Sequence, residues 1–209
     1  MNKIRPTDQT ASATAASAAM VRRLDRPIFV VGNPRSGNTL LSSLLSSSSD
    51  LVVTPEIHFL TYWLSSYRFL NLSRDRDFRF FVKQFTRSQR FGFLQLDPET
   101  TARQLNSLQE RNFKSVFEEV LESYRAGKDR PRVGEKTPGQ FAHVETLLGW
   151  FPDARIVWIV RDPRAVVASL LSSPFASPVV SQKAVRWKQA QNKLLSYADE
   201  QRVLSLIHI

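Results

Sequence analysis

Residues 27–41 of the chain read PIFVVGNPRSGNTLL. The stretch begins with an unbroken apolar run at 28–31, the pattern of a strand buried on both faces of a parallel sheet. A turn rich in glycine, proline and serine follows at 32–37, and leucines at 40, 41, 44 and 45 then recur with helical spacing. The stretch therefore predicts a strand, a loop and a helix in immediate succession.

The loop at 32–39 has the glycine spacing of a Walker A phosphate loop. Glycines let the backbone approach an anion, successive N–H groups point inward, and the following helix offers its N-terminus. Asn38 stands where ATPases have the lysine that reaches the β- and γ-phosphates. We therefore expect this loop to bind a different anion, with Arg35 supplying positive charge. The alternative is a glycine-rich turn that binds nothing.

The rest of the chain alternates strand patterns with helix patterns. Aromatic and apolar stripes at helical spacing fill the region 59–124, and we interpret them as core. Alternation of strands and helices predicts a mostly parallel sheet with helices on both faces. Further strands are expected at 51–53, around Val133, at 155–160 and from 203 to 207; further helices are expected at 141–148 with a stop at Gly149, after Asp162-Pro163, and after Pro178.

Composition excludes several classes of protein. Of the 209 residues, 42% are hydrophobic and 23% charged, which rules out wholesale disorder, collagen and coiled coil. No apolar run approaches the ~20 residues of a membrane span. The absence of cysteine excludes disulfides, thiolate metal sites and a cysteine nucleophile, and the three histidines lack zinc-site spacing, so we expect no metal.

The chain is strongly basic, with a net charge of +10. Such a charge favours an anionic partner: nucleic acid, a phosphorylated small molecule, an acidic polymer or a membrane surface. Residues 1–26 contain a run of only Ala, Ser and Thr at 10–19, and most of the arginines in this segment follow that run, unlike a signal peptide. We expect a flexible arm at 1–26 and one domain at 27–209.

Two blocks of sequence resemble sulfotransferases that use 3′-phosphoadenosine 5′-phosphosulfate (PAPS). Residues 27–41 are similar to the family's 5′-phosphosulfate loop, commonly written Pro-Arg-Ser-Gly-Thr-Thr-Leu, with Asn38 as a polar departure. Residues 151–169 resemble the 3′-phosphate block, whose signature is an arginine at a strand end and a serine eight residues later, here Arg161 and Ser169. Two helical turns separate such a pair, so a guanidinium and a hydroxyl can converge on one phosphate. The alternatives are a surface ion pair of Arg161 with Asp162 or Asp153, and a solvated position for Ser169.

The resemblance extends from about Pro27 to Tyr197 and implies a three-layer α/β fold like that of P-loop NTPases. It further implies PAPS as co-substrate, no required metal, and transfer of a sulfuryl group to a hydroxyl or amine acceptor. It implies neither a nucleic-acid partner nor a transmembrane segment, and we expect a cytoplasmic location. The donor-binding residues that it implies are Arg35, Ser36, Gly37, Asn38, Thr39, Arg161 and Ser169.

The resemblance also implies a catalytic set of Glu56, Lys136 and Arg35. Branches resembling tyrosylprotein and some carbohydrate sulfotransferases use a glutamate just after the second strand as the base, and Glu56 occupies that place. His58 is the second candidate for the base; Glu56 would otherwise be an acid at a helix N-terminus.

Lys136 lies in a Glu-Lys-Thr-Pro segment similar to one in the family, where the lysine points at the bridging oxygen of the donor. Otherwise Lys136 is a solvent-facing loop residue. Family members usually extend beyond the strand that begins near Arg202, so we expect the domain to be truncated at its C-terminus.

Two other functions stay open at this point. The basic charge and the expected truncation are compatible with a non-catalytic fragment that binds anions or nucleotides. A kinase-like phosphotransferase would share the loop, but Asn38 and the lack of an evident Walker B aspartate disfavour it. The sequence does not identify the acceptor or the oligomeric state.

Overall fold

The computed structural model describes residues 24–172 and 179–208. The expected arm therefore lies outside the described residues up to position 23. Its last part is not detached, because Leu24 is only 5% exposed and belongs to the hydrophobic core.

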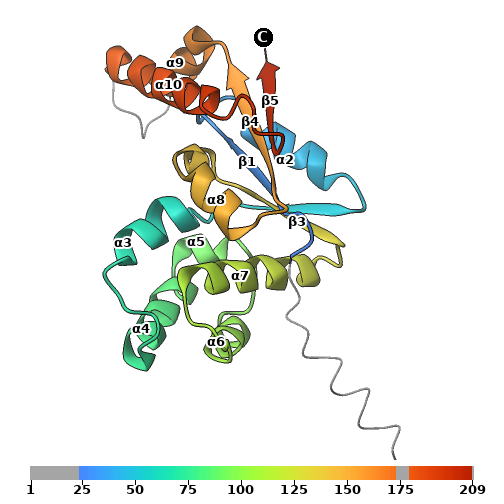
Figure 1. Ribbon diagram of the computed structural model, residues 1–209, viewed down its shortest axis with the longest axis vertical. Helices are drawn as coiled ribbons and strands as arrows, with labels where there is room; N and C mark the ends of the chain where they lie inside the picture. Colours follow the sequence, from blue (N-terminus) through green and yellow to red (C-terminus); the bar gives the residue numbers. More distant parts are fainter. Residues whose placement is uncertain (1–23, 173–178, 209) are drawn as a thin grey trace, which may run out of the picture.

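The centre of the fold is a five-stranded sheet with the strand order β2-β3-β1-β4-β5 (Figure 1). All four pairings between these strands are parallel, which confirms the predicted mostly parallel sheet. The strands are β1 Ile28–Gly32, β2 Leu51–Thr54, β3 Arg132–Lys136, β4 Arg155–Arg161 and β5 Val203–His208.

Helices cover the two faces of the sheet, as a three-layer α/β fold requires. Figure 1 shows α2 on one side of the strands, α8, α9 and α10 on the other, and α3 to α7 gathered at one end. The helical elements of the described residues are α2 Asn38–Ser46, η2 Phe59–Leu64, α3 Ser65–Tyr67, α4 Asp75–Thr86, α5 Gln89–Gly92, α6 Pro98–Asn106, α7 Phe113–Gly127, η3 Pro138–His143, α8 Val144–Trp150, α9 Pro163–Leu171 and α10 Val180–Leu195.

The helical region between β2 and β3 shares an aromatic core with the sheet. Phe117 of α7 stacks on Phe29 of β1 at a ring-centroid distance of 6.1 Å and on Phe59 of η2 at 4.6 Å. All three rings are fully buried. Offset aromatic pairs of this kind add to the free energy of burial. The core therefore holds the start of η2, and with it the chain just after β2, against the sheet.

One helix boundary differs from the sequence-based expectation. Gly149 was expected to end a helix, but it lies inside α8 because the Phe151 N–H still donates to the Leu147 carbonyl at 2.8 Å. The start of that predicted helix is instead the 3₁₀ segment η3. Pro138 begins η3, where proline is favoured because its missing N–H is not needed. The buried Phe151 follows the last residue of α8.

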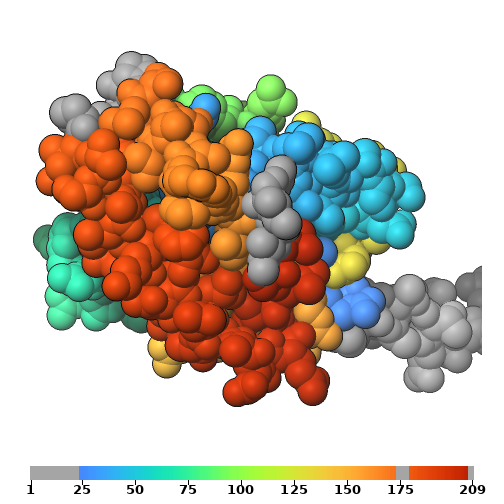
Figure 2. Space-filling model, turned by 90° about the horizontal axis from the view of Figure 1, so that it is seen from above, coloured from blue at the N-terminus to red at the C-terminus, as the bar shows by residue number. Residues whose placement is uncertain are grey.

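The strand order places a crevice at the carboxyl end of β1. From β1 the chain crosses over β3 to reach β2, and from β3 it crosses over β1 to reach β4. Ligands of open α/β sheets bind at such a switch point, outside the carboxyl ends of the strands. Figure 2 looks down from above and shows α9 in orange beside the light-blue segment that contains α2. The four loops that follow β1, β2, β3 and β4 therefore meet here.

Candidate active site

A cavity of about 470 Å³ occupies the switch point. This volume lies in the range of sites for small molecules. The cavity is lined by Pro34, Arg35, Gly37, Asn38, Thr39, Glu56, His58, Thr61, Pro138, Gly139, Arg161 and Ser169. Of the residues expected from sequence, Ser36 and Lys136 are not part of this lining. Lys136 nevertheless contacts Glu56 directly, and Ser36 is buried within the loop.

The loop after β1 can be formed only with glycine at its start. Gly32 has a φ of +142°, and a Cβ atom there would lie 2.5 Å from the Ile159 carbonyl oxygen of β4. Any side chain would therefore push β1 and β4 apart. Gly37 has a φ of +98° and directly precedes α2. Both glycines are needed for backbone conformations that other residues rarely adopt.

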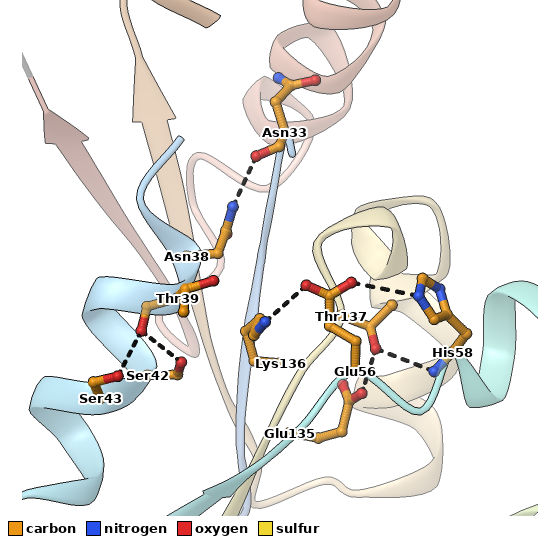
Figure 3. A network of polar contacts seen from close by, with 10 residues as sticks. All are labelled: Asn33, Asn38, Thr39, Ser42, Ser43, Glu56, His58, Glu135, Lys136 and Thr137. Carbon is orange, nitrogen blue, oxygen red and sulfur yellow. Dashed lines mark hydrogen bonds and ion pairs between the residues drawn. The ribbon is translucent and has the colours of Figure 1, made fainter. Parts of the chain in front are cut away.

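Asn38, at the position of the Walker lysine, closes the loop instead of reaching out of it. Its Nδ2 donates to the Asn33 carbonyl at 2.8 Å, and its side chain is buried (Figure 3). The buried Ser36 hydroxyl has no hydrogen-bond partner among the described residues. A buried polar group without a partner is costly. An anion in the loop would satisfy it. Thr39, at the first turn of α2, is exposed to the cavity.

Arg35, Arg161 and Ser169 form a cationic cluster on the α9 side of the cavity. The Arg35 Nε donates to the Ser169 Oγ at 2.9 Å, and a terminal guanidinium nitrogen of Arg161 donates to the Arg35 carbonyl at 3.0 Å. The carbonyl of Arg161 in turn accepts from the Trp187 indole N–H at 2.9 Å. The side-chain charge of Arg35 therefore lies beside Ser169.

The alternative ion pair of Arg161 with Asp162 is not observed. Asp162 instead pairs with Arg164 at 2.6 Å and accepts from the Arg164 N–H at the start of α9. These contacts hold the pKa of Asp162 down at about 2. Neither Arg35 nor Arg161 forms an ion pair with another residue of the described ranges. The cluster thus presents two guanidinium charges that an anionic group could neutralise.

Glu56 lies on the opposite side of the cavity and is held from two directions (Figure 3). Its Oε1 accepts from the Lys136 Nζ at 2.7 Å, and its Oε2 lies 3.4 Å from the His58 Nε2. Burial alone would raise the pKa of Glu56, but the hydrogen bonds from His58 and Lys136 and the Lys136 charge outweigh burial and lower it. Glu56 is therefore a carboxylate at neutral pH.

The geometry argues against the two structural alternatives for this pair. The helical turn of η2 begins only after His58, and Glu56 contacts Lys136 rather than the N-terminus of that turn. The Lys136 side chain is 9% exposed, so it does not face solvent. The pairing arises because β2 and β3 are neighbours, with Thr54 opposite Glu135 in the register.

His58 is fixed in an uncommon backbone conformation. Its φ is +53°, and its carbonyl accepts from the N–H groups of Tyr62 and Trp63 at 2.9 and 3.3 Å. Its Nδ1 lies 3.3 Å from the Thr61 hydroxyl, so the Nε2 is free to face Glu56. Strained conformations of this kind cluster at functional sites.

Glu135 lies beneath the site and supports it through Thr137, a role that the sequence analysis did not predict. Its side chain is fully buried, and its carboxyl accepts a short hydrogen bond from the Thr137 hydroxyl. That hydroxyl also accepts from the His58 N–H at 3.3 Å. Burial raises the pKa of Glu135 to about 8 despite the Thr137 hydrogen bond. The available signal in the sequence was an acidic residue next to the strand pattern around Val133, two residues before Thr137.

Two features are absent from the described part of the chain. Within residues 24–172 and 179–208, no three His, Cys, Asp or Glu side chains gather as a metal site would require. Within the same ranges, no helix combines the length and the apolar character that crossing a membrane demands.

The comparisons with known proteins agree with this arrangement. A sequence profile of the sulfotransferase family matches residues 27–206. An uncharacterized protein of Aquifex aeolicus (strain VF5) is 26% identical over 153 residues, which are 73% of this chain and 18% of that protein. This chain thus spans less than a fifth of the length of that relative.

Solved structures show the same fold. The sulfotransferase domain from the curacin biosynthetic pathway superposes with a TM-score of 0.57 at 21% identity, over 88% of this chain and 68% of that chain. Sulfotransferase STF9 from Mycobacterium avium superposes with a TM-score of 0.51 at 17% identity, over 94% and 62%. With the profile match extending from the start of β1 into β5, the chain belongs to the sulfotransferase family.

Proposed function

We propose that this chain transfers a sulfuryl group from PAPS to a hydroxyl or amine acceptor. One observation carries the proposal. A single cavity is lined by the anion loop, by Arg35, Arg161 and Ser169, and by Glu56, which Lys136 contacts from behind the lining. A donor with phosphate groups at two positions needs two separate anion sites, and in-line transfer needs a base and a cation between them.

The donor is held by two parts of the cavity. The loop N–H groups, the N-terminus of α2 and the Ser36 hydroxyl receive the 5′-phosphosulfate. Arg161 and Ser169 receive the 3′-phosphate, and Arg35, whose Nε contacts Ser169, lies between the two parts. The unpartnered Ser36 hydroxyl suits this donor, as do the two arginines, which contact no carboxylate within the described ranges.

The chemistry falls to Glu56 and Lys136. Glu56 removes the proton from the acceptor hydroxyl as the oxygen–sulfur bond forms, and the bond from sulfur to the bridging oxygen of the donor breaks. Lys136 donates to that bridging oxygen and stabilises the charge that develops on it. Arg35 and the loop hold the phosphate in line. His58 orients the Glu56 carboxylate through its Nε2 and is the second candidate for the base.

Binding of nucleotides to the full chain tests the donor assignment. Adenosine 3′,5′-bisphosphate should raise the melting temperature more than AMP at equal concentration, because a ligand that binds only the folded state stabilises it by mass action. Equal shifts from the two nucleotides would reject the separate 3′-phosphate site.

Transfer from radiolabelled PAPS in excess EDTA tests the class of reaction. We expect transfer to survive chelation, because Lys136 and Arg35 supply at the transferred group the positive charge that magnesium supplies in kinases. Activity that is lost with EDTA and restored by magnesium would favour the kinase-like alternative. Trials with phenols, glycans, lipids and peptides would find the acceptor.

A further inference from the structure

A second cavity, of about 660 Å³, adjoins the first. Glu56 and His58 line both cavities, so this pair forms the wall between them. The remainder of the second cavity comes from η2 and from the segment around α5, chiefly Tyr62, Trp63, Arg90 and Phe93. None of these four residues lines the first cavity.

We propose that the second cavity binds the acceptor, and that this acceptor is a hydroxylated aromatic compound that carries an anionic group. The inference rests on the proposed sulfuryl transfer and adds the class of substrate. It assigns Arg90 as the residue that selects the anion and Glu56 as the residue that receives the hydroxyl.

Position is the first argument. In-line transfer places the acceptor oxygen and the leaving oxygen on opposite sides of the sulfur, so the acceptor must reach Glu56 from the side away from the donor. The loop, Arg161 and Ser169 line only the first cavity. The second cavity touches Glu56 without touching them.

Charge is the second argument. The Arg90 guanidinium lies 4.3 Å from the centroid of the Tyr62 ring, a cation–π contact that holds it in place. No carboxylate of the described residues pairs with Arg90, whereas Arg79 and Arg111 both pair with Asp75. Arg90 is half-buried and keeps its donors available for a ligand.

Glu56 and Arg90 together determine the orientation of the acceptor in the second cavity. Its carboxylate repels an anionic group and attracts a hydroxyl proton, while Arg90 attracts the anionic group. The other titratable side chains in this lining are His58, which contacts Glu56, and Tyr62, whose ring lies against Arg90. An acceptor with a hydroxyl and an anion at opposite ends therefore fits in one orientation.

The aromatic wall is the third argument. Tyr62 and Phe93 are 38% and 53% exposed, and both rings line this one cavity, so together they offer a ligand an apolar surface. Trp63 is 3% exposed, and its buried indole N–H has no partner among the described residues. A flat ring between such surfaces gains burial.

Three probes that differ in one group test the proposal: 3-(4-hydroxyphenyl)propionate, its uncharged amide, and tyramine. Each is titrated by NMR into the full chain saturated with adenosine 3′,5′-bisphosphate. We expect the carboxylate to bind about 5- to 20-fold more tightly than the amide, and tyramine most weakly. That range lies between exposed and buried charged hydrogen bonds.

Two arginines allow a matched comparison of variants. Arg90→Gln should abolish the preference for the carboxylate, and Arg90→Lys should keep part of it. Arg87→Gln removes an exposed arginine that does not line the cavity and should change nothing. Equal binding of acid and amide to the unaltered chain, or equal effects of Arg87→Gln and Arg90→Gln, would overturn the proposal.

The thermal shift by the bisphosphate, measured on every variant, separates the two proposals and checks folding. A normal shift without preference for the carboxylate refutes the acceptor assignment and leaves the donor assignment standing. The bisphosphate could instead cause no thermal shift while the preference for the carboxylate still depends on Arg90. That result refutes the donor assignment and supports the second cavity as a binding site.

Discussion

The two sides of the first cavity differ in whether their charged side chains are paired. On the α9 side, Arg35 and Arg161 contact a hydroxyl and a carbonyl but no carboxylate of the described residues. On the other side, Glu56 is paired with Lys136 and faces His58. The first side needs a ligand to balance its charge, whereas the second is balanced without one. Substitutions on the first side should therefore change binding, and substitutions on the second should change chemistry.

The largest effect is expected at Glu56. The substitution Glu56→Gln keeps the size of the side chain but removes its ability to take a proton. Turnover should fall by ~10²–10⁴-fold, the usual share of general base catalysis. The bisphosphate should still bind, whereas the melting temperature should fall, because the substitution leaves the nearly buried Lys136 ammonium without a charged partner. Initial rates at saturating PAPS and acceptor measure the first quantity, and calorimetry measures the second.

His58→Ala is the matched control for the base. It should slow turnover less than Glu56→Gln, because it removes a group that orients the carboxylate. Normal turnover in Glu56→Gln together with an inactive His58→Ala would transfer the role of base to His58. If both variants remain active, the base lies elsewhere, and our interpretation of the end of β2 is wrong.

A smaller effect, confined to binding, is expected at Arg161. The substitution Arg161→Ala should weaken bisphosphate binding by about 10- to 100-fold, the scale of a hydrogen bond to a charged group. AMP, which lacks the 3′-phosphate, should lose little affinity. Isothermal titration with both nucleotides measures the difference. An equal loss for AMP would mean that Arg161 acts through the loop, by its contact with the Arg35 carbonyl.

The smallest effect per unit of the quantity varied concerns stability and its dependence on pH. Glu135 has a pKa of about 8 in the folded chain, against an ordinary value of 4.5 for a solvated glutamate. Between these values the folded chain keeps a proton that the unfolded chain loses, so stability falls as pH rises. Above about pH 8 both states are ionised and the loss is complete. The slope approaches about tenfold in the unfolding constant per pH unit.

The substitution Glu135→Gln should remove this slope, because the amide still accepts from Thr137 and has no proton to lose. Urea unfolding at several pH values between about 5 and 8 compares the two chains. Equal slopes would show that Glu135 is ionised in the folded state. The Glu56 side of the cavity would then carry a second negative charge, and its charges would not be balanced by Lys136.

Local patterns were sufficient to predict most of the fold. The apolar run of β1, the glycine loop and the leucines of α2 are contiguous, so neighbouring residues determine them. The spacing from Arg161 to Ser169 is also local, and the structure does bring both residues into the first cavity. Their roles in binding a donor remain predictions.

Features that depend on strand order could not be predicted in the same way. Glu56 meets Lys136 only because β2 and β3 are neighbours, although 80 positions separate the two residues. The direction of the Arg35 side chain depends on where α9 packs. The raised pKa of Glu135 depends on burial by several elements, which no short pattern encodes.

Lys136 contacts Glu56 in the structure and is also proposed to contact the donor, which affects the order of steps in the catalytic cycle. In the structure the Lys136 ammonium stabilises the ionised form of Glu56. A donor whose bridging oxygen draws Lys136 away would leave Glu56 with a weaker partner, so its pKa would rise and it would become a stronger base. Proton affinity at Glu56 and donor affinity at the loop are then thermodynamically coupled, and the coupling is reciprocal. Protonation of Glu56 should release Lys136 and tighten donor binding, so the base gains strength only once the group to be transferred is in place.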